Sequence, residues 1–540
     1  MNKFFKYISI SAGFLSILGI AGCDKSLDEK VYSVITPVNF YKTEADAKAA
    51  INGVYSELYT YDMYVQPFWN LTLLDDDHVS GSDWYLGAAG AGNPQNYWGV
   101  SRPWIGCYTL IARANTVLEN VSTMTGINEV VKNRILGEAY FLRGWAYLQL
   151  VQLYGEVPLR LKSLTADPNA DVPRSPVKDV YALIINDFKA AEANLVPPGD
   201  PSAGETGRVN KAVAQAFLAK AYLTMASGSA SNVTLMVKGG DNNIAYPHQK
   251  TVVAGYEPFD SQQYFQLARD KSLEVINSYK AVYPLIGWTE LWKKDNRNNG
   301  DHMWMLQSLE GTAFTNDLHS FFSARSQFGV GAVWMTNNHY NNYEDQDTRI
   351  LHGVTHNYQA GWGIDYFYPK KDAAKYEVVN GKTHINDGNG DEKAYVTKYS
   401  DVSNPQLGVS DAFFPLLRFA EVLLMYAEAE NELSTLPGIE AYKKLNEVRR
   451  RANASDAPVG MSKNGFRDYV LEERAREFAL ENSVRHFDLK RWGIYLSVMN
   501  KITQPQNNIN KQRSRRNLLL PIPPEEINTN KAITSNNPDW

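Results

Sequence analysis

Apolar residues recur at helical spacing along much of the chain. Residues 137–158, GEAYFLRGWAYLQLVQLYGEVP, give the clearest example, and one stripe of that segment holds Leu142, Ala146, Leu150 and Leu153. Most of its other positions are apolar as well, so we predict a helix that is buried on several sides. Gly155 and Pro158 supply the stop signal at its C-terminal end.

The same periodicity predicts further helices in both halves of the chain. The first begins near Thr43, a suitable N-cap ahead of an alanine-rich run. The others span 176–195, 210–226, 262–279, 413–433, 439–453 and 466–492. Because they follow one another in pairs with short links, we predict an all-α fold in which tetratricopeptide-like helical hairpins form a superhelical scaffold.

Two long segments, 62–104 and 284–412, lack helical periodicity and are rich in Asn, Gly, Asp, Tyr and Trp. Irregular segments of this length inside a compact domain are usually functional or disordered. Their aromatic content argues against disorder. We therefore expect these segments to be ligand-binding loops inserted into the helical scaffold.

The first 22 residues have the pattern of a secretory signal peptide. Lys3 and Lys6 precede an apolar run that is shorter than the ~20 residues of a membrane-spanning helix. The run ends in IAGC, which resembles a bacterial lipobox, so we expect Cys23 to be acylated; an ordinary signal peptide with an incidental cysteine is the alternative. Cys107 would then lack a disulfide partner, and residues 23–540 would form one domain tethered to a membrane.

Composition and charge narrow the possible functions. The 540-residue chain has a formal net charge of −5 and a pI near 6.1, which gives no support for a nucleic-acid-binding surface. Aromatic residues make up 12% of the chain, with 32 Tyr and 12 Trp. Most of them belong in the core, but this surplus permits a ligand-binding surface built from rings.

Several sequence blocks resemble the SusD/RagB family of outer-membrane nutrient-binding lipoproteins of Bacteroidota. Seven blocks follow one another in the family's order: FYKTEADAKAAINGVYSEL, EAYFLRGWAYLQLVQLYGEVPL, GRVNKAVAQAFLAKAYL, LLRFAEVLLMYAEAENEL, LNEVRRRAN, EERAREFALENSVRHFDLKRWG and the closing LLPIPPEEINTN with NNPDW. The resemblance implies a tetratricopeptide-like fold, exposure at the cell surface, a SusC-like TonB-dependent transporter as partner, and no catalysis. The ligand-contacting loops vary within the family, so the resemblance assigns no residue to a particular sugar.

The stretch SDWYLGAAGAGNPQNYWGV (82–100) permits two interpretations. Its glycines could cradle a phosphate, but such sites usually recruit Lys or Arg, and neither occurs from Ala49 through Ser101. Its flanks carry four rings, Trp84, Tyr85, Tyr97 and Trp98, interspersed with Asp, Asn and Gln. Rings cover the apolar faces of a pyranose and amide or carboxylate groups bind its hydroxyls, so we predict a sugar platform with at least two of the four rings exposed.

Two further ring clusters are candidates for the same role. Trp334 and Tyr340 alternate with asparagines that include Asn338, and we rank this cluster nearly equal to the first. Trp362 in AGWGIDYFY belongs to a third cluster. We predict no metal site and no cofactor.

Charged clusters have mainly structural interpretations. Asp75-Asp76-Asp77-His78 is the densest acidic group, but adjacent residues cannot easily flank a scissile glycosidic bond, so we expect a solvated loop there, with a bound cation as the alternative. NDGNGDE (386–392) lacks the full spacing of a calcium loop and is interpreted as a turn. Helix residues such as Arg418 with Glu421, and Glu481 with Arg485, can form pairs along one helix, and buried ion pairs between hairpins are expected.

Together these observations predict a surface lipoprotein of the outer membrane that captures an oligosaccharide or polysaccharide and delivers it to a SusC-like transporter. Capture of a peptide or another nutrient is the nearest alternative. A surface glycoside hydrolase and a purely structural lid are the others.

Overall fold

The computed structural model describes residues 40–324, 331–359, 365–368, 376–379, 382–385, 393–505 and 507–540. Cys23, Trp362 and the whole NDGNGDE segment therefore lie outside the described residues. The described part is mainly helical, as the periodicity predicts. Among its helices, none is both long and apolar enough to cross a membrane.

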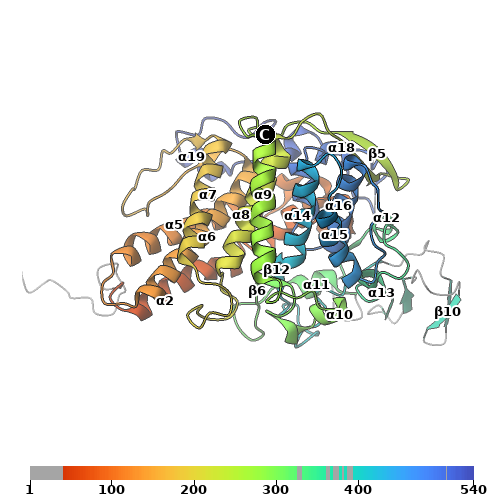
Figure 1. The fold of residues 1–540 in the computed structure, drawn as a ribbon, viewed down its shortest axis with the longest axis horizontal. Coiled ribbons are helices and arrows are strands. Elements are labelled where there is room, and N and C mark those ends of the chain that lie inside the picture. The colour runs from red at the N-terminus through yellow and green to blue at the C-terminus, as the bar shows by residue number, and fades with distance from the viewer. Residues whose placement is uncertain are drawn as a thin grey trace, which may run out of the picture.

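The long helices form a continuous row (Figure 1). In chain order they are α2 (Glu44–Tyr55), α5 (Arg102–Thr123), α6 (Glu129–Tyr154), α7 (Val177–Asn194), α8 (Lys211–Ser229), α9 (Ser261–Tyr279), α14 (Phe419–Leu433), α15 (Ile439–Arg451), α16 (Lys463–Glu477) and α17 (Val484–Arg491). Each of α6, α7 and α8 packs against its neighbours in the chain, and α9 joins the two halves by packing on α14. This arrangement is consistent with stacked helical hairpins.

Helix α6 is buried over most of its length, as its apolar pattern predicts. The Asn128 side chain caps its N-terminus, and Gly155, with φ of +71°, ends it as the sequence predicts. Gly144 lets α7 approach closely, since a Cβ there would lie 3.0 Å from Asp187 Cβ. Arg143 then donates two hydrogen bonds to the Asp187 carboxylate, at 2.9 and 2.7 Å, which ties the two helices together.

The described strands form six two-stranded antiparallel sheets. The pairs are β1 (Val79–Gly81) with β7 (Val333–Met335), β2 (Val157–Pro158) with β3 (Arg174–Ser175), β4 (Thr234–Gly239) with β5 (Ile244–Gln249), β6 (His302–Leu306) with β12 (Phe414–Arg418), β8 (Asn357–Gln359) with β9 (Asp365–Phe367), and β10 (Tyr376–Val379) with β11 (Lys382–Ile385). These small sheets fasten the loop segments together rather than forming a layer of their own.

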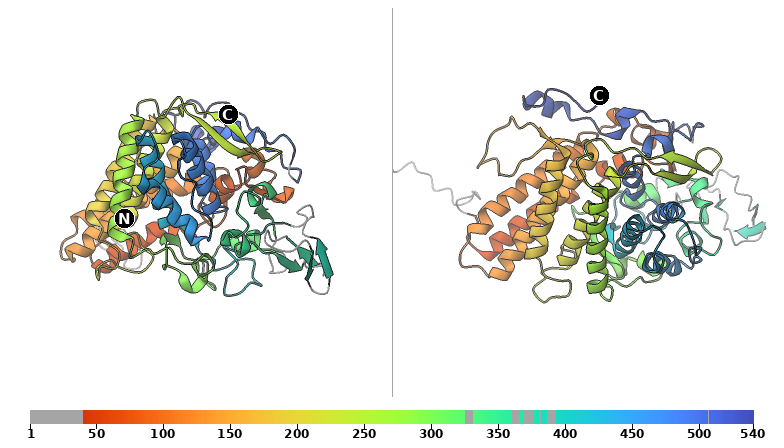
Figure 2. Two further views of the ribbon diagram at one scale, coloured as in Figure 1. Left: turned by 45° about the vertical axis from the view of Figure 1, so that its right-hand side comes forward. Right: turned by 45° about the horizontal axis from the view of Figure 1, so that its top comes forward.

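Short helices make up much of the rest of the described loop regions and of the C-terminal segment. They are α3 (Pro67–Leu73), α4 (Asp83–Leu86), α10 (Trp288–Leu291), α11 (Leu318–Phe322), α12 (Asn337–Tyr340), α13 (Thr348–Leu351), α18 (Tyr495–Met499) and α19 (Pro524–Thr529). The C-terminal segment, blue in Figure 2, runs across the top of the long helices.

The expected helix over 466–492 is in fact two helices. Leu480, Asn482 and Ser483 adopt left-handed backbone conformations between α16 and α17, which breaks the helix. The predicted pairs Arg418 with Glu421 and Glu481 with Arg485 are therefore wrong, because neither pair lies within one helix. Arg418 belongs to β12 and donates to Glu481 at 2.6 Å, so the ion pairs are buried and join separate elements as expected.

Candidate functional site

The segment predicted as a sugar platform folds into short helical turns that expose two tryptophans. Trp84 on α4 is 61% exposed and Trp98 is 58% exposed, whereas Tyr85 is half-buried and Tyr97 is buried. The prediction that at least two of these four rings are exposed is confirmed. We call these four residues the aromatic site.

A chain of contacts joins the two exposed rings. The Trp84 and Tyr85 ring centroids are 5.5 Å apart, and the Tyr97 and Trp98 centroids are also 5.5 Å apart. The Tyr85 hydroxyl donates to Asn70 Oδ1 at 2.7 Å, and Asn70 Nδ2 donates to the Tyr97 hydroxyl at 2.8 Å. Asn70 is buried on α3 and fixes the positions of both tyrosines, and each tyrosine in turn contacts its neighbouring tryptophan.

Three neighbours of the aromatic site escaped the sequence interpretation. Tyr61 is exposed with its ring centroid 6.4 Å from that of Trp98, and Phe321 of α11 stacks on Tyr85 at 4.2 Å. The Arg102 guanidinium lies 5.9 Å from the Trp98 ring centroid. The aromatic run YTYDMY around Tyr61 could have indicated the first of these, but no sequence signal indicates Phe321.

The glycines of this stretch make room for an arginine rather than a phosphate. Gly92 has a φ of +71°, and a Cβ there would lie 2.8 Å from Arg513 Cδ. Arg513 donates to the Gly90 carbonyl at 2.6 Å and to Asp75 Oδ1 at 2.7 Å. The cation beside these glycines is therefore already neutralised by a carboxylate.

The acidic segment Asp75–Asp77 is buried, so the expected solvated loop is wrong. Asp75 pairs with Arg513, and Asp77 accepts two hydrogen bonds from Arg485 at 2.9 and 2.7 Å. Burial alone would raise the pKa of Asp75, but Arg513 and its other neighbours lower that pKa to about 2. The carboxylates of Asp75 and Asp77 are therefore engaged in ion pairs inside the protein, and that of Asp76 accepts hydrogen bonds from the backbone amides of His78 and Val79.

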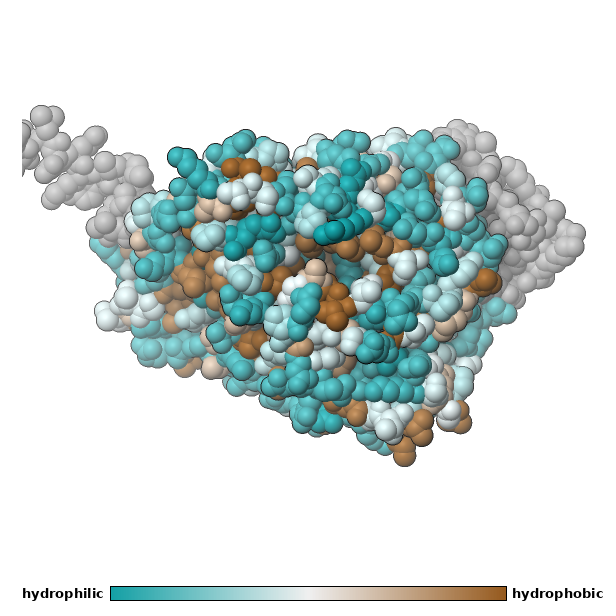
Figure 3. All heavy atoms as spheres, turned by 90° about the horizontal axis from the view of Figure 1, so that it is seen from above, coloured by the Kyte–Doolittle hydropathy of each residue, from teal (hydrophilic) through white to brown (hydrophobic). Residues whose placement is uncertain are grey.

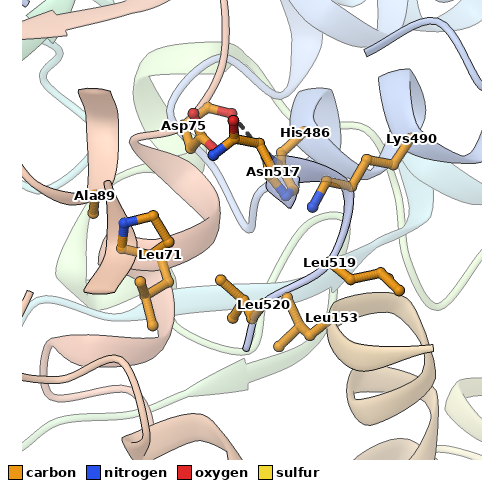
Figure 4. A pocket seen from close by; sticks show the side chains of 10 residues that line it. Leu71, Asp75, Ala89, Leu153, His486, Lys490, Asn517, Leu519 and Leu520 are labelled. Carbon is orange, nitrogen blue, oxygen red and sulfur yellow. Dashed lines mark hydrogen bonds between the residues drawn. The ribbon is translucent and has the colours of Figure 1, made fainter. Parts of the chain in front are cut away.

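A small cavity lies between the acidic segment and the C-terminal part of the chain. Figure 4 shows this cavity, of about 10 Å³, with Asp75, His486 and Lys490 on one side and Leu519 and Leu520 opposite. This volume is about that of one water molecule, which excludes a sugar. Burial lowers the pKa of His486 to about 3, so its ring stays neutral beside the Asp75 carbonyl, 2.7 Å from Nδ1.

A larger cavity, of about 450 Å³, opens between α6, α8, α17 and α18. Its walls are mainly apolar and include Val252, Tyr256, Phe487 and Leu496. Seen from above, hydrophobic residues gather near the middle of the molecule (Figure 3). None of the described residues that line this cavity is a tryptophan, and mainly apolar walls offer few partners to sugar hydroxyls, so the aromatic site is the better candidate for a glycan.

The second predicted ring cluster is part of the core and offers no exposed platform. Trp334 is 6% exposed because β7 pairs with β1 and its ring packs edge-on against Tyr395 at 5.9 Å. Tyr340 on α12 is 3% exposed and packs edge-on against Tyr368. Asn338 donates to the Gly240 carbonyl at 2.9 Å, which ties α12 to the turn between β4 and β5.

Among the described residues, no group of three His, Cys, Asp or Glu side chains is arranged to hold a metal ion.

Two family models match this chain, one in each half. Residues 291–540 match the model described as the SusD family, and residues 24–223 match the model described as starch-binding associating with outer membrane. The chain is 27% identical to SusD-like protein P2 of Formosa agariphila, over 97% of this chain and 98% of that protein. It is 25% identical to a SusD-like protein of Bacteroides ovatus, over 74% and 66% of the two chains.

Solved structures show the same fold. A SusD superfamily protein from Parabacteroides distasonis superimposes with a TM-score of 0.71 at 21% identity, covering 92% of this chain and 99% of that one. A SusD-like carbohydrate binding protein from Bacteroides fragilis gives a TM-score of 0.68 at 20% identity, covering 91% and 99% of the two chains.

Proposed function

This chain belongs to the SusD family, and from that premise we propose that it binds an oligosaccharide or polysaccharide at the outer membrane through the aromatic site. The observation that carries this proposal is the pair of exposed tryptophans, Trp84 and Trp98, joined through Tyr85, Asn70 and Tyr97. Related proteins described as starch-binding and carbohydrate-binding support a glycan as the ligand.

The geometry suits an uncharged, ring-shaped ligand. Exposed indole faces can cover the apolar C–H faces of a sugar, and the side chains of Asp83 and Gln95 stand beside them as exposed partners for hydroxyls. Contacts of this kind are individually weak and reversible. Reversible capture fits a protein that passes its ligand on, because slow dissociation would delay release.

Binding rather than hydrolysis is the activity that these residues support. The densest acidic segment is paired with Arg485 and Arg513 inside the protein, which leaves it without the opposed carboxyl groups that glycoside hydrolysis requires. We further propose that acylated Cys23 anchors the protein and that a SusC-like TonB-dependent transporter receives the glycan, as the family resemblance implies.

Affinity electrophoresis tests the proposal. The wild-type protein should be retarded in gels that contain its polysaccharide, and the double variant Trp84→Ala/Trp98→Ala should migrate as in a gel without polysaccharide. Leu436→Ala, which alters an exposed apolar side chain outside the aromatic site, is the matched control and should behave as the wild type.

Three outcomes would count against parts of the proposal. Retardation of the double variant would contradict the choice of site. New reducing ends in the polysaccharide would indicate a hydrolase. Unaltered migration in every polysaccharide gel would favour a peptide or another nutrient as the ligand.

A further inference from the structure

Asp317 stands at the N-cap of α11, the short helix whose Phe321 stacks on Tyr85 of the aromatic site. Three residues before it, Phe314 packs edge-on against Tyr59 with ring centroids 5.3 Å apart. Four residues after it, Phe321 stacks on Tyr85. Between them, buried Asn316 donates to the Ser308 hydroxyl at 2.7 Å, so the segment that carries Asp317 is anchored on both sides.

The Asp317 carboxylate is half-buried and lacks a donor. Within the part of the chain that the structure describes, it accepts no hydrogen bond and forms no ion pair. Burial raises its pKa to about 6. A carboxylate that has lost part of its hydration without gaining a donor is unfavourable, so a ligand that supplies O–H groups would be stabilised there.

The charge of Asp317 acts on the aromatic site itself. It is the main cause that raises the pKa of Tyr61, and it adds to burial in raising the pKa values of Tyr85 and Tyr97. The nearby cation, Arg102, is already paired with Asp62 at 2.8 Å. A ligand at the aromatic site would therefore meet a negative field.

We propose that Asp317 accepts hydrogen bonds from hydroxyls of the bound sugar and makes the aromatic site selective for neutral glycans over glycans that carry carboxylate groups. This inference rests on the proposed glycan-binding function. It specifies that the preferred glycan is uncharged. Like charges at contact distance repel, and in a partly buried site this repulsion is large enough to weaken binding by about tenfold or more.

Matched polysaccharides and the Asp317→Asn variant test this selectivity. Gels containing soluble starch, galactomannan or arabinan, each native and carboxymethylated, provide pairs that share a backbone and differ in charge. For a pair whose native form retards the wild type, the native form should bind at least tenfold more tightly than its carboxymethylated form. In Asp317→Asn this ratio should fall severalfold, because the repulsion is removed. Carboxymethylation also blocks hydroxyls, but this effect is common to both proteins and cancels in the comparison.

A pH series gives a second readout. Binding of the native polysaccharide by the wild type should strengthen from pH 5 to pH 7, with a midpoint near pH 6, because ionised Asp317 is the better acceptor. Tyr61, Tyr85 and Tyr97 stay protonated over this range because their pKa values are raised. The nearby cation Arg102 is paired with Asp62 in both proteins, so Asp317→Asn should give a nearly flat profile.

The outcomes separate this inference from the function on which it rests. An unchanged ratio and an unchanged pH profile in a folded Asp317→Asn variant would overturn the charge selectivity and leave glycan binding intact. Absence of retardation by every native and carboxymethylated polysaccharide would overturn both. The variant replaces an unpaired side chain by one of the same shape, so its melting temperature should match or exceed that of the wild type.

Discussion

Two stretches of one loop region, Asp75–Asp77 and Trp84–Trp98, are close in sequence and opposite in design. The first is acidic and would be expected at the surface, yet it is buried and paired with arginines. The second is aromatic, and it exposes two tryptophans, as predicted. In this region the acidic residues are buried in the structure, whereas two uncharged rings face the solvent.

The acidic stretch is buried because cations from distant parts of the chain contact it. Arg485 follows the break between α16 and α17, and Lys511 and Arg513 come from the segment after α18. Lys511 donates to the carbonyls of Asp76 and Val79, at 3.0 and 2.9 Å, so the acidic stretch is fastened to the C-terminal part of the molecule. Within the described ranges, Arg102 of α5 is the one cation that lies over a ring of the aromatic site.

Breaking the Asp75–Arg513 pair should have the largest effect on stability. In Asp75→Asn the Arg513 guanidinium stays buried without its counter-charge, so the free energy of unfolding should fall by about 3–5 kcal/mol. Denaturation by urea, followed by circular dichroism, measures this loss. Asp83→Asn, which alters an exposed carboxylate nearby, should change stability by less than about 0.5 kcal/mol. Similar losses in both variants would erase the distinction between the two stretches.

Acid should weaken the same pair. The pKa of Asp75 is lowered to about 2, below its value in the unfolded chain, so the unfolded state takes up protons first. The stabilisation is complete above about pH 4 and is lost as the pH falls from 4 towards 2, and it amounts to about 2 kcal/mol. The difference in unfolding free energy between wild type and Asp75→Asn, measured at several pH values, isolates this carboxylate. A difference that does not shrink towards pH 2 would contradict the assignment.

Substitution of Gly92 tests the contact of the aromatic stretch with Arg513, the partner of Asp75, and should have a smaller effect on the free energy of unfolding. Gly92→Ala places a methyl group against Arg513 in a left-handed backbone conformation, whereas Gly126→Ala adds one in a similar conformation with open space around it. The backbone cost is common to both, so Gly92→Ala should lose about 1 kcal/mol more than Gly126→Ala. Equal losses would show that Arg513 can move aside freely.

The scaffold was predictable because its signals are local. The helical period and the Gly155 stop both lie within or beside the element that they define, and the structure confirms α6 on that basis. The exposure of at least two of the four rings between Trp84 and Trp98 was predicted as well, although the sequence did not indicate which two.

The acidic segment and the second ring cluster were mispredicted because their partners are remote. The sequence around Asp77 gives no sign that Arg485 will be its partner. The sequence around Trp334 likewise gives no sign that Trp334 will pair with Ser80 across β1 and β7. Asp317 escaped notice for the same reason, since its relation to Tyr61 and Tyr97 exists only in the folded chain.

Trp98→Ala should change stability least and yet weaken glycan binding. Trp98 is more than half exposed, so Trp98→Ala should alter the free energy of unfolding by no more than about 0.5 kcal/mol. It should nevertheless weaken glycan binding by about tenfold, because an indole face in contact with a sugar ring is lost. Asp75→Asn should show the reverse, with a large loss of stability and near-normal binding by the molecules that remain folded. If Trp98→Ala unfolds the protein, or if Asp75→Asn abolishes binding while folded, then the two stretches form one cooperative unit and the division between structural charge and ligand-facing rings is wrong.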